Sequence, residues 1–110
     1  MTPAEQQTVS VLIAGIGGYG HYYLKTLLEE FDSGTVKLAG VVDPRAADCA
    51  LYPAVCSMDV PVFQTMEDFY SGGHSADLAL VVSPAHFHVP QSLEALAHGS
   101  CVLCDKPMCA

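Results

Sequence analysis

Three glycines near the amino terminus are the residues whose spacing points most directly to chemistry. Gly15, Gly17 and Gly20 form a G-x-G-x-x-G pattern that follows an apolar run and precedes a helical pattern. The first glycine permits a tight turn, the second lets the backbone approach a pyrophosphate, and the third lets helix and strand pack closely. The helix N-terminus then offers N–H groups and partial positive charge to the phosphates. The pattern predicts dinucleotide binding, with contacts also expected from the intervening Ile16, Gly18 and Tyr19.

A carboxylate further along the chain supports this prediction. Asp43 lies 23 residues beyond Gly20, at the end of the second apolar run. A carboxylate there accepts hydrogen bonds from the hydroxyls of the adenosine ribose. Its charge would repel a 2′-phosphate, so the sequence favours NAD(H) over NADP(H), although Arg45 could soften this preference. An alternative role for Asp43 is that of a helix N-cap, with Pro44 at the first helical position.

Five short apolar runs predict the strands that must position these residues. They cover residues 9–15, 36–42, 61–63, 76–82 and 101–104. Helical patterns alternate with them, and the connections are short. This order predicts an α/β fold with a doubly wound parallel sheet built by right-handed crossovers. The length of 110 residues suits a single domain over the whole chain, 1–110.

Two helices are expected in the first half. The first follows Gly20, where an apolar face repeats at helical spacing and Gly34 is available as a stop. That face consists of Leu24, Leu27, Leu28 and Phe31. Three tyrosines of the same helix are expected to be packing residues: Tyr19, Tyr22 and Tyr23. The stretch from Pro44 to Asp59 indicates only a short helix over 45–51, followed by irregular chain at 52–53.

Two further helices are expected in the second half. Thr65 and Asp68 resemble a capping box, which predicts a brief helix through Tyr70 that ends at 72–73. An amphipathic helix is expected from His88 or Val89 to Ala97, closed by Gly99. Its apolar positions on one face are Val89, Leu93 and Leu96.

Composition and charge exclude several classes of function. Hydrophobic residues make up 51% of the chain, so there is material for a core, and 12 acidic against 4 basic residues give a net charge of -8. Such a charge disfavours binding to nucleic acid or to an anionic membrane surface. No run reaches the roughly 18–20 apolar residues of a membrane span, and the first residues do not resemble a signal peptide. We therefore expect a cytoplasmic protein.

The cysteines leave a second hypothesis open. They number five, and Cys101 and Cys104 form a C-x-x-C. A single such pair is weak support for a redox or zinc site. If 101–104 is a strand, the two thiols point to opposite faces. His86 and His88 stand two apart without accompanying carboxylates or cysteines, so no metal site is predicted.

From Val9 to Pro107 the sequence resembles the Gfo/Idh/MocA oxidoreductase family. The resemblance rests on the glycine turn, on the segment S-P-A-H-F-H at 83–88, and on D-K-P at 105–107, which occur in the family's order. It implies an N-terminal Rossmann domain whose fourth strand ends at Ser83 and Pro84 beside the dinucleotide. His88 matches the histidine that opens the next helix. Asp105 replaces the usual glutamate, and Ala85 stands where asparagine is common.

The resemblance also implies an activity. Lys106 would lie near the nicotinamide ribose and the substrate and help orient both, as the catalytic contribution of this chain. The reaction would move a hydride between the nicotinamide of NAD, or of NADP, and a sugar, cyclitol or similar hydroxy compound. Family members carry a C-terminal substrate domain that is absent from this chain, so the chain alone is expected to be inactive. The apolar edge left after residues 101–104 would favour self-association into a homo-oligomer.

Two other functions remain open on the sequence alone. The same glycine turn would serve a dinucleotide-binding or sensing module that performs no catalysis. A thiol-redox or metal protein would instead use Cys101, Cys104 and Cys109.

Overall fold

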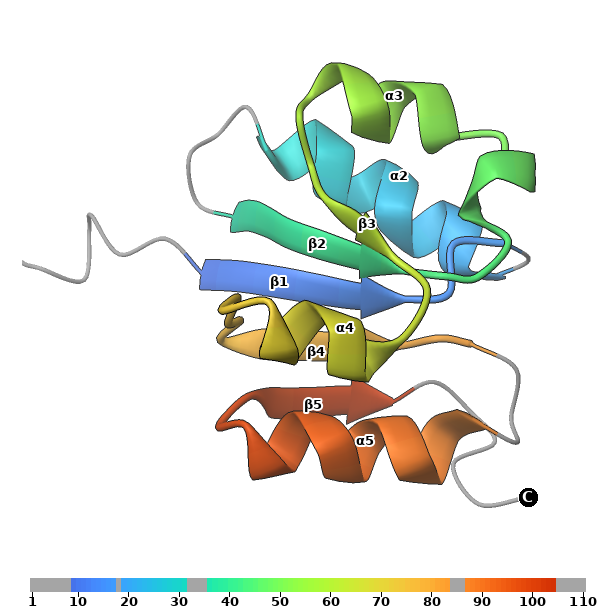
Figure 1. Cartoon of the computed structure of the whole chain (residues 1–110). Coiled ribbons are helices and arrows are strands. Elements are labelled where there is room, and N and C mark those ends of the chain that lie inside the picture. The colour runs from blue at the N-terminus through green and yellow to red at the C-terminus, as the bar shows by residue number, and fades with distance from the viewer. Residues whose placement is uncertain (1–8, 18, 32–35, 84–86, 105–110) are drawn as a thin grey trace, which may run out of the picture.

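A twisted parallel sheet lies at the centre of the molecule (Figure 1). A computed structural model of the protein describes residues 9–17, 19–31, 36–83 and 87–104, and within them the five strands pair in the order β3-β2-β1-β4-β5. All four pairings are parallel. The strands are β1 Val9–Ala14, β2 Val36–Val42, β3 Val62–Phe63, β4 Leu78–Val81 and β5 Cys101–Cys104. The predicted doubly wound α/β sheet is confirmed.

Helices cover both faces of the sheet. They are α2 Tyr19–Phe31, α3 Tyr52–Ser57, α4 Met66–Ser71 and α5 His88–Ala97, with a 3-10 turn, η1, at Ala46–Asp48. The helices α2 and α3 lie on one side, and α4 and α5 on the other (Figure 1). Right-handed crossovers require this arrangement, because the chain moves from β1 toward β3 and then returns across β1 to β4.

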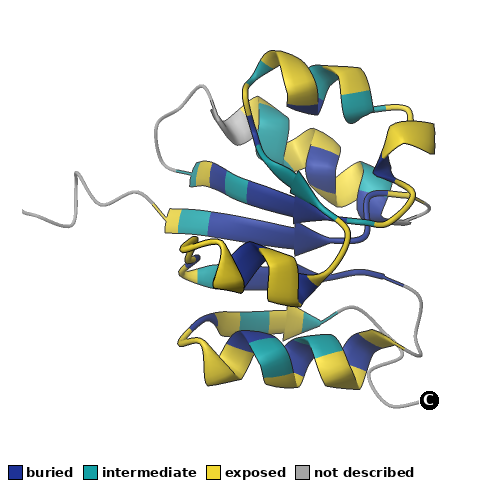
Figure 2. Ribbon diagram, viewed as in Figure 1, coloured by how far each residue is buried: buried dark blue, intermediate teal, exposed yellow. Residues whose placement is uncertain are grey.

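The central strand β1 is buried on both faces, as its continuous apolar sequence predicts. Val11 and Ile13 join the core beneath α2 and α3, while Leu12 and Ala14 join the core beneath α4 and α5. Figure 2 shows this burial as a dark band through the middle strands. The glycine turn therefore starts from a strand that is fixed on both sides.

The connection between β2 and β3 differs from the prediction. The helix expected over 45–51 is only the 3-10 turn η1, and the α-helix begins later, at Tyr52. Pro53 lies in the first turn of α3, where a missing N–H costs no hydrogen bond and the fixed φ suits a helix. The sequence interpretation was wrong because it took Tyr52 and Pro53 as irregular chain.

The capped helix α4 confirms its prediction. Thr65 stands at the N-cap, and its Oγ1 accepts a hydrogen bond of 3.0 Å from the N–H of Asp68. The helix ends at Ser71, directly before Gly72 and Gly73. Strand β4 is shorter than predicted, since only 78–81 of the expected 76–82 are paired as a strand.

The apolar face of α5 points to solvent, which the amphipathic pattern did not indicate. Val89, Leu93 and Leu96 are all exposed, while the residues turned toward the sheet are His88, Ser92 and Ala95. Small side chains let α5 lie close to β4 and β5, and His88 is satisfied by a hydrogen bond described below. Gly99, with φ of +87°, closes the helix as predicted.

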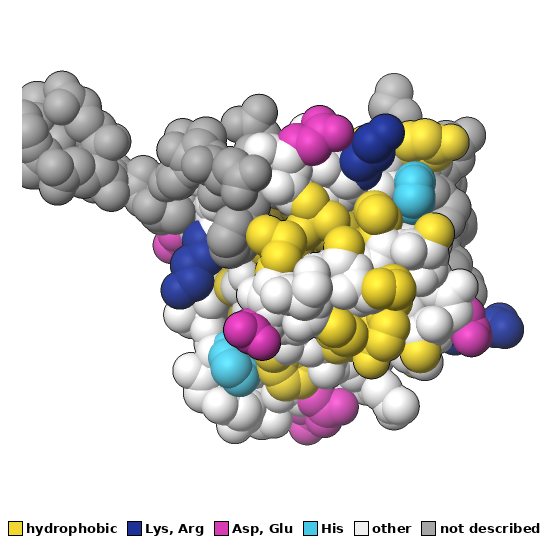
Figure 3. Space-filling view, turned by 90° about the horizontal axis from the view of Figure 1, so that it is seen from above, with side chains coloured by type: hydrophobic (Ala, Val, Ile, Leu, Met, Phe, Trp, Pro, Cys, Tyr) yellow, Lys and Arg dark blue, Asp and Glu magenta, His cyan; other side chains and the backbone are white. Residues whose placement is uncertain are grey.

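Apolar side chains are also exposed on the side of α2. Tyr22 is 67% exposed and Tyr23 is 37% exposed, so the prediction that they are packing residues was wrong. They line a shallow groove with Leu27, Leu80 and the exposed Leu103 of the edge strand β5. Figure 3, seen from above, shows a separate gathering of hydrophobic side chains in the middle of the end of the molecule where α3 lies. Among the described helices, none is long and apolar enough to cross a bilayer.

Candidate functional site

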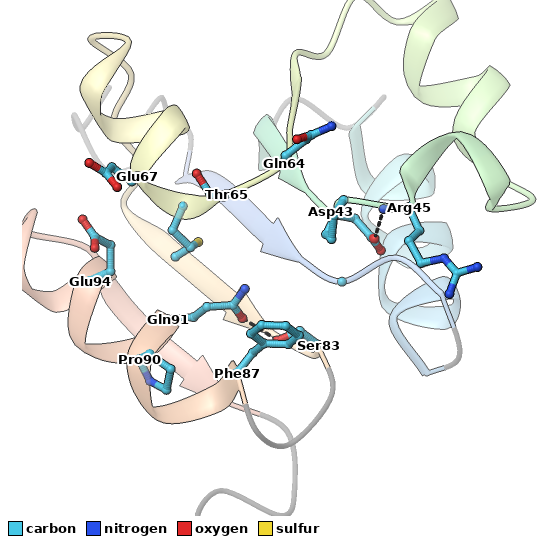
Figure 4. A pocket seen from close by; sticks show the side chains of 13 residues that line it. Asp43, Arg45, Gln64, Thr65, Glu67, Ser83, Phe87, Pro90, Gln91 and Glu94 are labelled. Atoms are coloured by element: carbon cyan, nitrogen blue, oxygen red, sulfur yellow. Dashed lines mark hydrogen bonds between the residues drawn. The ribbon is translucent and has the colours of Figure 1, made fainter.

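The carboxyl ends of β1, β2 and β4 meet at one edge of the sheet. Strand β1 pairs with β2 on one side and with β4 on the other, so the strand order reverses between β1 and β4. In open parallel sheets this reversal separates the two following loops and leaves a crevice where ligands bind. Gly15, Asp43 and Ser83 come from the three loops at that point, and all three line one pocket (Figure 4).

Main-chain atoms of neighbouring segments lie very close to two glycines of the turn. Gly15 has φ of +95°, and a Cβ atom there would lie 2.7 Å from the Cα of Ser83. A Cβ atom on Gly20 would lie 2.0 Å from the carbonyl oxygen of Gly15, so α2 starts in direct contact with the turn. Both positions require glycine for the fold, which agrees with the tasks expected of them.

The middle of the turn is open to solvent. Gly17 is exposed, and among the described residues a Cβ atom there would meet only the Sγ of Cys49, at 3.7 Å. Ile16 is fully buried beneath the turn, and Tyr19 opens α2. The described residues therefore leave room for a side chain at Gly17. Gly18 lies outside the described residues.

Asp43 joins the glycine turn to the loop after β2. Its Oδ2 accepts a hydrogen bond of 2.9 Å from the N–H of Ile16, and its Oδ1 accepts one of 2.8 Å from the N–H of Arg45. The carboxylate is half-buried and faces the pocket rim. The alternative N-cap role is not observed, because Arg45 precedes η1 and no side chain caps that turn. Each oxygen keeps a lone pair with which it can accept from a ribose hydroxyl.

Among the described residues that line this pocket, Arg45 is the single cation. Its guanidinium lies 3.9 Å from Asp48, and both side chains are largely exposed. An exposed pair at that distance contributes little to stability. The side chain is therefore available at the rim, beside the loop that follows Asp43.

Two hydrogen bonds, one at its carbonyl oxygen and one at its hydroxyl, fix Ser83 just after β4. Its carbonyl oxygen accepts a hydrogen bond of 2.5 Å from Nε2–H of the buried His88. Its hydroxyl donates to Oε1 of Gln91, one turn further along α5. His88 thus acts here through Ser83, as a residue that holds the loop in place.

The pocket has a volume of about 350 Å³ and is bounded mostly by apolar surface. Pro44, Met66, Phe87 and Pro90 supply that surface from three segments: the loop after β2, the start of α4 and the start of α5. Two acidic residues, Glu67 of α4 and Glu94 of α5, lie at the end of the pocket away from Asp43, whereas Gln64 lies nearer to Asp43 (Figure 4). Figure 4 shows the carboxylates of Glu67 and Glu94 at the same end of the pocket.

Sequence reasoning missed most of the α4 and α5 side of this pocket. Thr65 was identified only as a cap, and Gln64, Glu67, Gln91 and Glu94 carried no motif. One signal was available, because Gln64 follows the carboxyl end of a parallel strand and so belongs to the binding edge. The spacing of three residues between Gln91 and Glu94 also places both on one side of a helix.

Several predicted site residues lie outside the described residues, namely Pro84, Asp105 and Lys106. Among the residues that are described, no group of three histidine, cysteine or acidic side chains is placed to hold a metal ion. Cys101 is exposed and Cys104 half-buried, and their positions in β5 put the thiols on opposite faces of the sheet. The proposed thiol site thus gains no support from the described cysteines.

Cys49 lies beside the glycine turn, and the surroundings of its thiol shift the pKa of that thiol. Burial raises the pKa of the Cys49 thiol, and the carboxylates of Asp43 and Asp48 raise it further, against an opposing effect of Arg45. The Sγ is 3.5 Å from the carbonyl oxygen of Arg45, to which it donates. The thiol is therefore held in its protonated form.

Known proteins share the fold described above. Residues 9–110 match a sequence model of the Gfo/Idh/MocA group, described as an oxidoreductase family with an NAD-binding Rossmann fold. The fold is similar to scyllo-inositol dehydrogenase from Lactobacillus casei, with a TM-score of 0.79 and 27% identity over 94% of this chain and 30% of that one. A structure of that enzyme with bound NAD(H) and scyllo-inositol gives a TM-score of 0.78, 26% identity, and 94% and 29% coverage.

A more distant structural relative shares the fold. The WlbA dehydrogenase from Bordetella pertussis, solved with NADH and UDP-GlcNAcA, has a TM-score of 0.76 and 21% identity over 94% of this chain and 30% of that one. No match comes from the curated protein sequences. The chain thus spans less than a third of the length of these structural relatives.

Proposed function

Because the chain belongs to the Gfo/Idh/MocA oxidoreductase family through its NAD-binding Rossmann fold, we propose that it forms the dinucleotide site of a dehydrogenase. The reaction would transfer a hydride between the nicotinamide and a carbinol carbon of a sugar, cyclitol or similar hydroxy compound. Two relatives that act on inositols or bind a nucleotide sugar support this substrate class. The proposal concerns a protein that includes this chain, since the relatives are much longer.

The observation that carries the proposal is the junction of Asp43 with the glycine turn. Asp43 is held by N–H groups from both loops, so its remaining lone pairs face a fixed position at the pocket rim. The exposed backbone at Gly17 lies at the start of α2, where a pyrophosphate would receive N–H groups. These residues fit a dinucleotide, with the adenosine ribose on Asp43 and the phosphates on the turn.

The chain's own residues would bind and orient rather than transfer protons. When bound, the nicotinamide supplies the hydride acceptor or donor. Ser83 would form the floor between the two halves of the dinucleotide, since it lies against Gly15 and is held by His88. Lys106 would orient the nicotinamide ribose and the substrate, as the family resemblance implies.

Cofactor choice follows from charge at the rim. A 2′-phosphate next to Asp43 would face like charge at a carboxylate that has no room to turn away, because both oxygens are already engaged. Arg45 offers partial compensation from the exposed side of the loop. We therefore propose NAD(H) as the preferred cofactor.

Titration of the chain with NADH and with NADPH, followed by nucleotide fluorescence, tests this function. We expect NADH to bind more tightly than NADPH, and Asp43→Asn to reduce that difference. Asp59→Asn is a matched control, because it removes one negative charge from an exposed turn that tolerates asparagine at φ of 59°. Tighter binding of NADPH would contradict the cofactor choice, and binding of neither would contradict the function.

Turnover requires a protein that includes the rest of the enzyme. There we expect Lys106→Ala to leave most NADH affinity and to lower turnover of a polyol substrate. Equal turnover in the variant would remove Lys106 from the mechanism. NADH binding without oxidation of any inositol or sugar tried would favour a binding or sensing module instead.

A further inference from the structure

The glycine turn rests against main chain from the strands on both sides of β1. On one side, the N–H of Gly15 donates to the carbonyl oxygen of Val42 over 2.8 Å. On the other side, Gly15 lies so close to Ser83 that an added Cβ atom would be 2.7 Å from the Cα and the N of that residue. The position of the glycine turn therefore depends on where the main chain of Ser83 lies.

The first turn of α5 holds Ser83 in that place. A main-chain hydrogen bond of 2.9 Å, from the N–H of Val82 to the carbonyl oxygen of Ala14, ties the preceding residue to β1. Beyond it, the carbonyl oxygen of Ser83 accepts from Nε2–H of His88, and the hydroxyl of Ser83 donates to Gln91. Both partners belong to the start of α5, so this helix fixes the segment against which the glycine turn rests.

His88 is placed to act on the turn without touching a ligand. The residue is 2% exposed, and it is not among the described residues that line the pocket. A carbonyl oxygen can only accept, so Nε2 of His88 carries the proton of this bond. Loss of the donor would leave a carbonyl oxygen in the protein interior without it, which costs more than the bond itself contributes. The main chain at Ser83 would then shift to find another donor.

We propose that His88 is a positioning residue for the dinucleotide, setting the affinity for NADH by holding Ser83 against the glycine turn. This inference rests on the proposed function. The effect passes through two contacts, from the imidazole to the carbonyl of Ser83 and from the main chain of Ser83 to Gly15. The N–H groups at the start of α2 face the pyrophosphate from this turn, so a shift of the turn changes their direction.

Three substitutions at residue 88, followed by NADH fluorescence titration, test the proposal. The amide nitrogen of a glutamine is three bonds from Cβ, as Nε2 of histidine is, so His88→Gln should bind NADH nearly as tightly as the unaltered chain. In His88→Asn the amide nitrogen is one bond closer to Cβ and cannot reach the carbonyl of Ser83. We expect His88→Asn and His88→Leu to bind NADH about tenfold more weakly, the scale of one lost buried hydrogen bond.

Tyr70→Phe is the matched control for loss of stability. It also removes one buried hydrogen bond, from Tyr70 to Ser100, but at the amino end of β5 and away from the glycine turn. This variant should have a lower urea midpoint and an unchanged NADH affinity. Weakening of NADH binding in Tyr70→Phe equal to that in His88→Leu would assign the effect to stability and overturn the inference.

The comparison of glutamine with asparagine decides even when His88→Leu does not fold. Equal NADH affinity of His88→Gln and His88→Asn would overturn the positioning role, because the two amides differ only in reach. Such a result would leave the proposed function intact, since the unaltered chain still binds NADH. Absence of NADH binding by the unaltered chain would instead overturn the proposed function, and this inference with it.

Discussion

Replacing Gly15 by alanine separates two reasons why the turn after β1 needs glycine. The φ of Gly15 is +95°, a region that side chains rarely adopt. A Cβ atom there would also lie 2.7 Å from both the Cα and the N of Ser83. The variant combines backbone strain with overlap against neighbouring main chain, and rotation of a side chain relieves neither.

The expected loss follows from these two effects. A left-handed conformation costs an L-residue about 1–2 kcal/mol, and the stiffer unfolded chain of the alanine variant offsets about 0.4–1 kcal/mol of that. Overlap in a packed interior adds about 1–3 kcal/mol. We expect Gly15→Ala to lower the free energy of unfolding by about 1–5 kcal/mol, a large part of the about 5–15 kcal/mol of a typical domain.

Urea unfolding followed by circular dichroism measures this change. Gly73→Ala is the control for strain alone, because Gly73 has φ of +87° and no atom of the described residues lies within 4 Å of its Cβ position. It should cost about 1 kcal/mol or less. Gly20→Ala shows the effect of overlap without positive φ, since its Cβ would lie 2.0 Å from the carbonyl oxygen of Gly15.

The comparison between variants decides the outcome. If Gly15→Ala and Gly73→Ala lower the free energy of unfolding equally, the approach of Ser83 contributes nothing and the reasoning is refuted. If Gly15→Ala lowers the free energy of unfolding more than Gly73→Ala does, NADH affinity should also fall in Gly15→Ala, because Ser83 lines the pocket and must move.

Three further outcomes are expected. Gly17→Val should abolish the fluorescence enhancement of NADH yet keep the urea midpoint near that of the unaltered chain, because within the described part of the chain a Cβ there meets only Cys49 Sγ, at 3.7 Å; retained enhancement would count against the pyrophosphate position. Tyr70→Phe removes a hydroxyl 2.7 Å from the Oγ of Ser100 and should cost about 1 kcal/mol in urea unfolding, whereas an unchanged midpoint would show that this bond adds nothing. Because burial raises the pKa of the Cys49 thiol, its thiolate forms at higher pH, so alkylation near neutral pH should be slower at Cys49 than at exposed Cys101, as peptide mass spectrometry can measure. Faster labelling of Cys49 would contradict the described surroundings of that thiol.

Local patterns predicted those parts of the fold that depend on neighbouring residues. The passage from β1 through Gly15 into α2 is continuous in sequence, so spacing alone locates it. The cap of α4 is equally local, because Thr65 and Asp68 stand three residues apart. The parallel order of the strands followed from alternation and handedness rather than from any single residue.

The parts that could not be predicted depend on contacts between distant segments. The pattern of α5 suggested burial of Leu93, but the helix packs through Ser92 and Ala95 against β4 and β5. Hydrophobicity alone does not reveal how closely two elements approach. The pocket likewise is lined by residues of both α4 and α5. The hydrogen bond between Ser83 and Gln91 forms only after β4 and α5 have packed together.

The two hydrogen bonds accepted by Asp43 bear on attempts to change the cofactor of such an enzyme. Redesign toward a phosphorylated dinucleotide usually begins by replacing the acid at this position with a small or neutral residue. Here the same carboxylate ties Ile16 to Arg45, and each N–H to a charged acceptor is worth about 1.5–3 kcal/mol. A small residue would leave both N–H groups without that acceptor and would loosen the glycine turn. In this chain a basic residue added near Arg45, with Asp43 kept, is the more conservative route to altered cofactor preference.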